Sequence, residues 1–147
     1  MRAAFLLASI LTLAMPGLSY AELLLIVHPD NPIRELNRKQ ASDLYFGRVT
    51  TVTGDGRSTA PALTLYDQPG DSSSREQFYR ALNGMPLSQV NAYWARLRFS
   101  GDVMPPHALP DYRAVVEAVR RNPKGVGYID AASAHDSVRV VLRLREY

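Results

Sequence analysis

The sequence contains no cysteine and only three histidines. The absence of thiols excludes disulfide bridges, a thiolate nucleophile, a cysteine zinc site and a lipid anchor on cysteine. The histidines, His28, His107 and His135, are scattered and lack a metal-ligand spacing such as H-x-x-x-H. We therefore expect no metal site and no cofactor.

Signs of nucleic acid binding and of catalysis are also missing. The 17 Lys+Arg and 14 Asp+Glu give a net charge of +3, which is too small for a nucleic-acid-binding surface. There is no G-x-S-x-G elbow, no P-loop and no His-Glu-x-x-His. No pair of acidic residues is placed by spacing for acid–base catalysis. We expect no nucleic acid partner and no enzymatic activity.

Residues 1–21 have the features of a cleavable signal peptide. A positive start precedes the apolar run Ala3–Leu13, and Ser19–Ala21 provides a small-x-small cleavage site. A membrane anchor is disfavoured, because the run is shorter than the roughly 20 residues of a membrane span and Pro16 and Gly17 break it. The sequence thus predicts export and a soluble periplasmic protein.

Residues 22–147 are predicted to form one α/β domain with a mixed sheet flanked by helices. An apolar content of 46% is typical of a globular protein, and the length suits one domain rather than a receptor of two lobes. Leu23–Val27 is a continuous apolar run, as in a strand buried on both faces. Residues 62–66 and 125–130 predict two further strands.

Caps and periodicity predict the helices. Asn37 and Asp111 are expected to cap the first and the last helix. Apolar residues at helical spacing predict a helix over residues 87–98, on which Trp94 is expected to pack in the core rather than stack on a ligand. Residues 101–110 contain three prolines and are expected to be a loop.

The C-terminal segment alternates in polarity and predicts a strand with one face on the core and the other in water. The core positions would be Val138, Val140, Leu142 and Leu144, alternating with Arg139, Val141, Arg143 and Arg145.

Three segments, in order, resemble motifs of the phosphate-binding proteins of ABC transporters. Asn31-Pro32, the helix end Asp43–Arg48 (DLYFGR) and the turn Thr50–Gly56 (TTVTGDG) resemble that family's NP…(D)IFxGxxxxWxDG. Asp67–Phe78 (DQPGDSSSREQF) resembles its R-x-x-x-S-G-T-x-x-x-F loop and helix, and Gly125–Ile129 (GVGYI) resembles its GxIGY strand. The resemblance covers roughly residues 24–130.

The resemblance implies one lobe of the type 2 periplasmic-binding-protein fold, as in short proteins often labelled phosphate ABC transporter substrate-binding. Such receptors close two lobes around their ligand, and this chain has the length of one lobe. The implied partners are phosphate or another small oxyanion and a membrane permease.

The candidate binding site is the loop that leads into the helix after residue 72. Its physical basis is the positive end of a helix with free N–H groups next to several hydroxyls. The resemblance places Gln68 at the family's phosphate-binding arginine and Ser72, Ser73 and Ser74 at its S-G-T. Glutamine for arginine and Ser73 for glycine are departures. Losing a bidentate arginine removes about 3 kcal/mol, or roughly a hundredfold in affinity.

The same residues have simpler interpretations. Ser73 with Glu76 three residues later is expected to form a capping box, so the serines could serve only as a helix cap. Arg75 would either replace the missing positive charge or be solvated in the first helical turn. Asp71 would repel an anion.

Two functions therefore remain open. The first is a protein that binds a small oxyanion through Gln68, Ser72, Ser73, Ser74 and Arg75. The second is an interaction module that has lost its small ligand and docks on a membrane sensor or an outer-membrane partner. The oligomeric state is open as well, since two single lobes could together rebuild a cleft.

Overall fold

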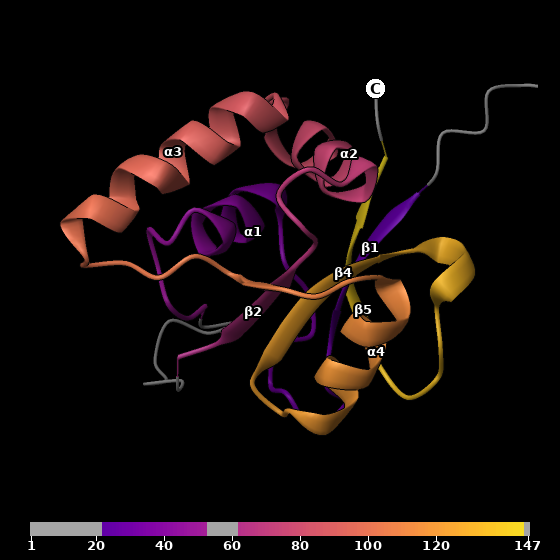
Figure 1. Ribbon diagram of the computed structural model, residues 1–147. Coiled ribbons are helices and arrows are strands. Elements are labelled where there is room, and N and C mark those ends of the chain that lie inside the picture. Colours follow the sequence, from indigo (N-terminus) through magenta and orange to yellow (C-terminus); the bar gives the residue numbers. More distant parts are fainter. Residues whose placement is uncertain (1–21, 53–61, 146–147) are drawn as a thin grey trace, which may run out of the picture.

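The apolar run Leu23–Val27 forms strand β1, and all five of its residues are buried. The computed structural model of the protein describes residues 22–52 and 62–145 (Figure 1). The predicted signal peptide and the glycine turn at residues 54–56 lie outside the described residues. The burial of β1 confirms the expected strand with two covered faces.

Strand β1 lies inside a five-stranded mixed sheet of order β3-β2-β4-β1-β5. It pairs antiparallel with β4 and β5, whereas β2 pairs parallel with β4 and β3. The register of β1 with its two neighbours is seen at Leu25, which lies opposite Tyr128 of β4 on one side and Leu142 of β5 on the other. The other strands are β2 (Thr64–Asp67), β3 (His107–Ala108), β4 (Gly125–Asp130) and β5 (Arg139–Leu144).

Two of the four α-helices begin at the capping side chain that the sequence predicted, Asn37 and Asp111. Asn37 Oδ1 accepts from the Gln40 N–H, and the Asn37 N–H donates to Gln40 Oε1 in return, which is a capping box. Asp111 accepts from the Ala114 N–H. The helices are α1 (Arg38–Tyr45), α2 (Ser73–Asn83), α3 (Leu87–Ser100) and α4 (Tyr112–Arg121), and a 3-10 turn, η1, covers Ala131–Ser133.

Helices cover both faces of the sheet (Figure 1). On one face, Leu23 and Leu25 pack with Leu44 of α1, Phe78 of α2 and Trp94 of α3. On the other face, the alternate β1 residues Leu24 and Ile26 pack with residues of α4. Successive side chains of a strand point to opposite faces, so the continuous apolar run of β1 supplies both cores.

A glycine brings α4 close to the sheet. A Cβ on Gly127 would collide with the Val115 side chain of α4, so that side chain or the helix would have to shift. The glycines of β4 therefore do more than bound the strand, because Gly127 leaves room for the helix that covers this face.

The alternation in β5 does not give the expected single core face. A register shift between Leu25 and Ile26 marks a β-bulge, since these residues lie opposite Leu142 and Val140. Val140 packs in the α4 core and Leu142 in the other core. A bulge inserts one unpaired residue and so reverses which face the later side chains meet. The apolar residues of β5 thereby serve both cores.

Residues 101–110 are not entirely loop. His107 and Ala108 form the short edge strand β3, in which His107 lies opposite Tyr66 of β2. The Leu109 N–H donates to the Asp67 carbonyl at 2.8 Å and extends this pairing. Pro105 and Pro106 precede the paired residues and Pro110 follows them, so none of the three removes a donor from this pairing.

Candidate functional site

Helix α2 begins at a side chain other than the expected one. Ser72 is the N-cap, and its Oγ accepts from the Arg75 N–H at 3.2 Å. The capping box predicted for Ser73 is wrong, because the Glu76 carboxylate accepts from Arg80 instead, at 3.0 Å. Ser73 is exposed.

Ser74 lies near a neighbouring helix. Burial raises the pKa of Tyr112 at the start of α4, and the nearby Ser74 side chain partly opposes this rise. The three serines therefore differ in their surroundings: Ser72 caps α2, Ser73 faces solvent and Ser74 lies near α4.

At the end of β2, the carboxylate of Asp67 is buried and accepts four hydrogen bonds. Oδ1 accepts from the Gln68 N–H at 2.7 Å and from the Tyr128 hydroxyl. Oδ2 accepts from Arg75 Nε at 3.1 Å and from the Tyr79 hydroxyl at 2.8 Å. A buried charge is tolerated only when it is paired and hydrogen-bonded, and Asp67 meets both conditions.

Arg75 is the positive partner of this group, and the expectation that it is solvated is wrong. The residue is 7% exposed. Besides Asp67, its guanidinium donates from Nη1 to Asn91 Oδ1 of α3 and lies 5.1 Å from the centroid of the Tyr79 ring. Its charge is thus neutralised by Asp67 and is not free to attract an anion.

The tyrosines around Asp67 remain protonated. Burial, with the nearby Asp67 charge as the second cause, raises the pKa of both Tyr79 and Tyr128 well above its usual value of 10.0. Protonated phenols can donate to a carboxylate, so both hydroxyls stabilise the Asp67 charge.

A cleft of about 290 Å³ opens beside this group, between α3 and residues 105–108. Of the five predicted ligand-binding residues, only Gln68 and Arg75 line it. The remaining lining residues are Asp67, Gly70, Asn91, Trp94, Ala95, Arg98, Pro105, Pro106 and Ala108.

Two nitrogen atoms of the lining are buried without a hydrogen-bond partner among the described residues. They are Nε2 of Gln68 and Nε1 of Trp94, on residues that are 3% and 4% exposed. Trp94 belongs to the core, as expected, and it also lines the cleft. Sequence reasoning missed Asn91 and Arg98, since nothing in the helical periodicity of α3 distinguishes them from other exposed polar residues.

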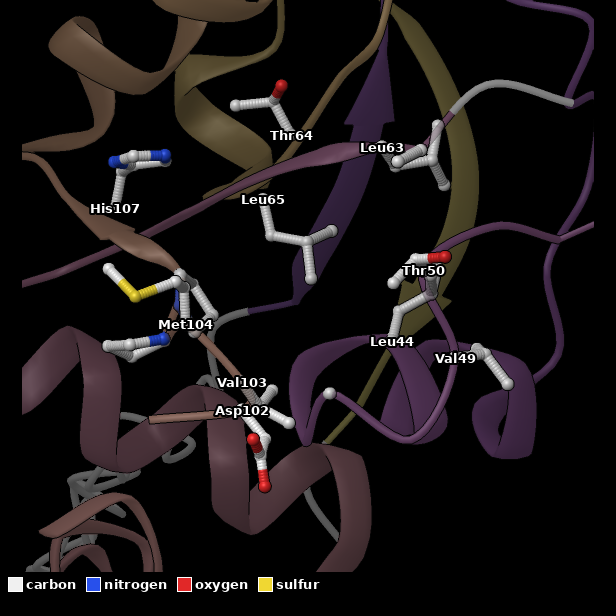
Figure 2. A pocket seen from close by; sticks show the side chains of 14 residues that line it. Leu44, Val49, Thr50, Leu63, Thr64, Leu65, Asp102, Val103, Met104 and His107 are labelled. Carbon is white, nitrogen blue, oxygen red and sulfur yellow. The ribbon is translucent and has the colours of Figure 1, made fainter. Parts of the chain in front are cut away.

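A second hollow, of about 300 Å³, lies between the end of α1, β2 and the segment before β3 (Figure 2). Its labelled side chains are mostly apolar and include Leu44, Leu65 and Met104, with Asp102 and His107 as its titratable groups (Figure 2). Met104 is 83% exposed. This hollow is suited to apolar contact.

Within residues 22–52 and 62–145, no cluster of three or more His, Asp or Glu side chains is placed to hold a metal ion. No helix in that part of the chain is long and apolar enough to cross a bilayer.

Solved structures share this fold. A protein from Clostridium perfringens, described as a phosphate ABC transporter substrate-binding protein with bound phosphate, aligns with a TM-score of 0.64 and 22% identity. An ABC-type phosphate transport receptor from Vibrio cholerae aligns with a TM-score of 0.63 and 20% identity, and PstS from Borrelia burgdorferi with 0.62 and 15%. No protein-family model and no curated protein matches the sequence.

The alignments cover 83% of this chain but only 44%, 46% and 47% of those three chains. The chain therefore spans less than half the length of these neighbours. The expected fold, a mixed α/β sheet of the periplasmic-binding-protein type, is confirmed.

Proposed function

We propose that the protein is exported to the periplasm and there binds a small oxyanion next to Gln68, without catalysing a reaction. Export is supported by the positive, apolar and small-residue parts of residues 1–21. The binding role is supported by the fold shared with phosphate receptors.

One observation carries the binding proposal: Gln68, directly after β2, lines a cleft of about 290 Å³. The resemblance places this residue at the position of the family's phosphate-binding arginine. Helix α2 begins five residues later, and its positive end favours an anion nearby.

The charges around the site set the expected strength. Arg75 is paired with Asp67, so it does not compensate for the arginine that Gln68 replaces. We expect binding that is about a hundredfold weaker than that of a site with a bidentate arginine.

Isothermal titration of the purified protein with phosphate and with sulfate tests this proposal. We expect saturable heat that disappears in Gln68→Leu, with Gln77→Leu on the exposed side of α2 as the matched control. An absence of heat at millimolar anion, with folded protein, would refute anion binding and leave the fold unaffected.

A specific observation favours the second candidate, a module that has lost its small ligand and docks on a membrane sensor or an outer-membrane partner. Phe99 near the end of α3 is 95% exposed and Met104 is 83% exposed. Large apolar side chains at such exposure are typical of interaction surfaces when they cluster. Site-specific photo-crosslinking from position 99 in intact cells, with position 77 as the control, tests this function. Crosslinks to one membrane protein from position 99 alone support it, and an absence of crosslinks counts against it.

A further inference from the structure

A groove of about 680 Å³ lies along helix α4, which covers the face of the sheet opposite to helices α1, α2 and α3 (Figure 1). The helix forms one wall of the groove and residues 133–137 form the other. Apart from Val116, the lining is polar and consists of Arg113, Glu117, Arg120, Ser133, His135 and Ser137. The volume lies within the range of ligand-binding sites.

The two arginines of the lining lie on one side of α4, two helical turns apart. Arg113, Val116, Glu117 and Arg120 are separated by the steps of three and four residues that bring side chains to the same side of a helix. The distance from Arg113 to Arg120 along the helix axis is about 10 Å, at about 1.5 Å per residue. This wall of the groove is therefore long enough for an extended ligand.

The acidic side chain of the lining is already neutralised. Glu117 Oε1 accepts from Arg120 Nη2 at 2.8 Å and lies 2.6 Å from Arg121 Nε, while Oε2 accepts from Arg120 Nε at 3.0 Å. Two guanidinium groups thus share one carboxylate, and one positive charge remains at this end of the groove. Asp136 is exposed in the loop that forms the other wall, but it does not line the groove.

Arg113 carries the positive charge at the other end. Its side chain is exposed and forms no ion pair or hydrogen bond with another residue of 22–52 and 62–145. It also lies in the first turn of α4, where the helix dipole disfavours a cation. Arg113 therefore adds a free guanidinium to the groove at a position that local helix energetics do not favour.

The wall opposite α4 supplies neutral hydrogen-bond donors. His135 Nδ1 accepts from the Ser137 N–H at 3.1 Å, so a neutral ring carries its proton on Nε2. Neither this N–H nor the Ser133 hydroxyl has a hydrogen-bond partner within the described part of the chain. Both groups can donate to a carbonyl or carboxylate oxygen. The groove thus favours an occupant that is rich in acceptors and negatively charged.

An acidic peptide in the polyproline II conformation matches the two positive ends. This conformation rises about 3.1 Å per residue and turns once in three residues, so the side chains of its first and fourth residues lie on one side, about 9 Å apart. That spacing is close to the separation of Arg113 and Arg120 along α4. The backbone forms no internal hydrogen bonds, so its carbonyls are available to the donors of Ser133 and His135.

We infer that the groove between α4 and residues 133–137 docks an extended acidic segment of a partner protein. One carboxylate of that segment binds at Arg113, and a second carboxylate, three residues away, binds at Arg120. The inference goes beyond the proposed function, because the groove shares no lining residue with the cleft beside Gln68.

A peptide titration followed by NMR tests the inference. The purified, isotope-labelled protein is titrated with acetyl-Gly-Glu-Pro-Pro-Glu-Gly-amide in about 0.1 M salt, where exposed charges more than about 10 Å apart are largely screened. We expect saturable shifts of the backbone amide resonances, confined to residues 113–120 and 133–137.

Three other titrants test whether charge and spacing select the peptide. A peptide with glutamine in place of both glutamates should bind about tenfold more weakly. The peptide Gly-Pro-Glu-Glu-Pro-Gly, which has the same charge on adjacent residues, should bind about fivefold more weakly because it reaches only one of the arginines. Sodium sulfate at matched ionic strength should leave the same amide resonances largely unshifted.

Arg113→Glu locates the contact. The variant should remain folded, because the helix dipole favours an acidic residue in the first turn. It should weaken peptide binding about tenfold, since it removes an attraction and adds a repulsion. Arg96→Glu is the matched control: it changes the net charge equally at an exposed residue of α3 that does not line the groove, and it should leave binding within about twofold. Thermal unfolding checks that both variants are folded.

Four results would overturn the inference. They are an absence of peptide-induced shifts, equal weakening by Arg113→Glu and Arg96→Glu, equal binding of the peptide with adjacent glutamates, and sulfate shifts as large as those with the peptide. The last result would identify a small anion as the occupant. Each is read at residues 113–120 and 133–137, whereas the proposed function depends on Gln68, so the two fail independently.

Discussion

Arg75 Nε donates to Asp67 Oδ2 across 3.1 Å, and the two side chains are only 8% and 4% exposed. The pair joins the end of β2 to the first turn of α2. It therefore holds the ends of the loop that carries Gln68 and borders the cleft. The loop's position depends on a buried ion pair rather than on the serines alone.

Breaking this pair at one end should be costly. We expect Arg75→Met to lower the free energy of unfolding by about 3–5 kcal/mol, because it leaves an unpaired charge in the interior. The double variant Asp67→Asn with Arg75→Met should lose less than Arg75→Met alone. Urea denaturation measures both.

The control is Arg80→Met, which removes an exposed pair with Glu76. Such pairs contribute about 0–1 kcal/mol. Equal losses in Arg75→Met and Arg80→Met would contradict the role assigned to the buried pair.

Substitution of two adjacent serines tests which residue caps helix α2. Ser72→Ala removes the side chain that accepts from the Arg75 N–H and should cost about 1 kcal/mol. Ser73→Ala changes an exposed residue and should stay within about 0.5 kcal/mol of the unchanged protein. Thermal unfolding of both variants decides it, and a larger loss in Ser73→Ala would contradict this assignment of the cap.

Stability should fall in alkali. Burial, assisted by the Asp67 charge, raises the pKa of Tyr45, Tyr79 and Tyr128 above 10.0 in the folded protein. Below pH 10 these phenols are protonated in both states, so their contribution to stability is fully present. Above pH 10 they ionise more readily in the unfolded chain, so stability decreases as the pH rises towards the folded-state values.

The midpoint of urea-induced unfolding, measured between pH 8 and pH 11, tests this expectation. This range extends from about two units below to about one unit above the usual phenol pKa. Tyr128→Phe should reduce the decline, because one phenol no longer ionises on unfolding. A flat profile for the unchanged protein would show that the phenols do not govern alkaline stability.

Arg139 should stabilise the fold although it occupies a position expected to face water. Its guanidinium donates to the carbonyls of Pro29, Asn31 and Ile33 at 2.6, 2.8 and 3.2 Å. Arg139→Ala should lower the free energy of unfolding by about 1–3 kcal/mol, since it leaves those carbonyls without a donor.

Arg143→Ala on the same strand is the matched control. Arg143 is 61% exposed and lies 3.7 Å from Glu22, so its loss should cost less than about 1 kcal/mol. Similar losses in the two variants would refute the anchoring role of Arg139.

Much of the fold follows from local patterns. The apolar run of β1 and the caps Asn37 and Asp111 were all predictable, because each depends on residues within one or two turns. The likeness of Gln68–Phe78 to a binding loop also pointed to the region of the cleft.

Other features depend on contacts between distant residues. The bulge that divides β5 between two cores is a property of its pairing with β1, and alternation along one strand contains no information about it. The burial of Arg75 arises from Asp67 and Asn91, eight and 16 residues away. The sequence around an arginine in the first turn of a helix looks the same whether the arginine is solvated or paired with distant residues.

The sequence by itself therefore determined a mixed α/β domain without thiol chemistry and with its loop at the start of α2, because propensity, capping and polarity are local properties. Only the tertiary structure decided which groups of that loop are free to bind. Gln68 lines the same cleft as Trp94 and Arg98 of α3, and Arg75 forms a buried ion pair with Asp67. Both arrangements depend on how separate elements of the fold pack together.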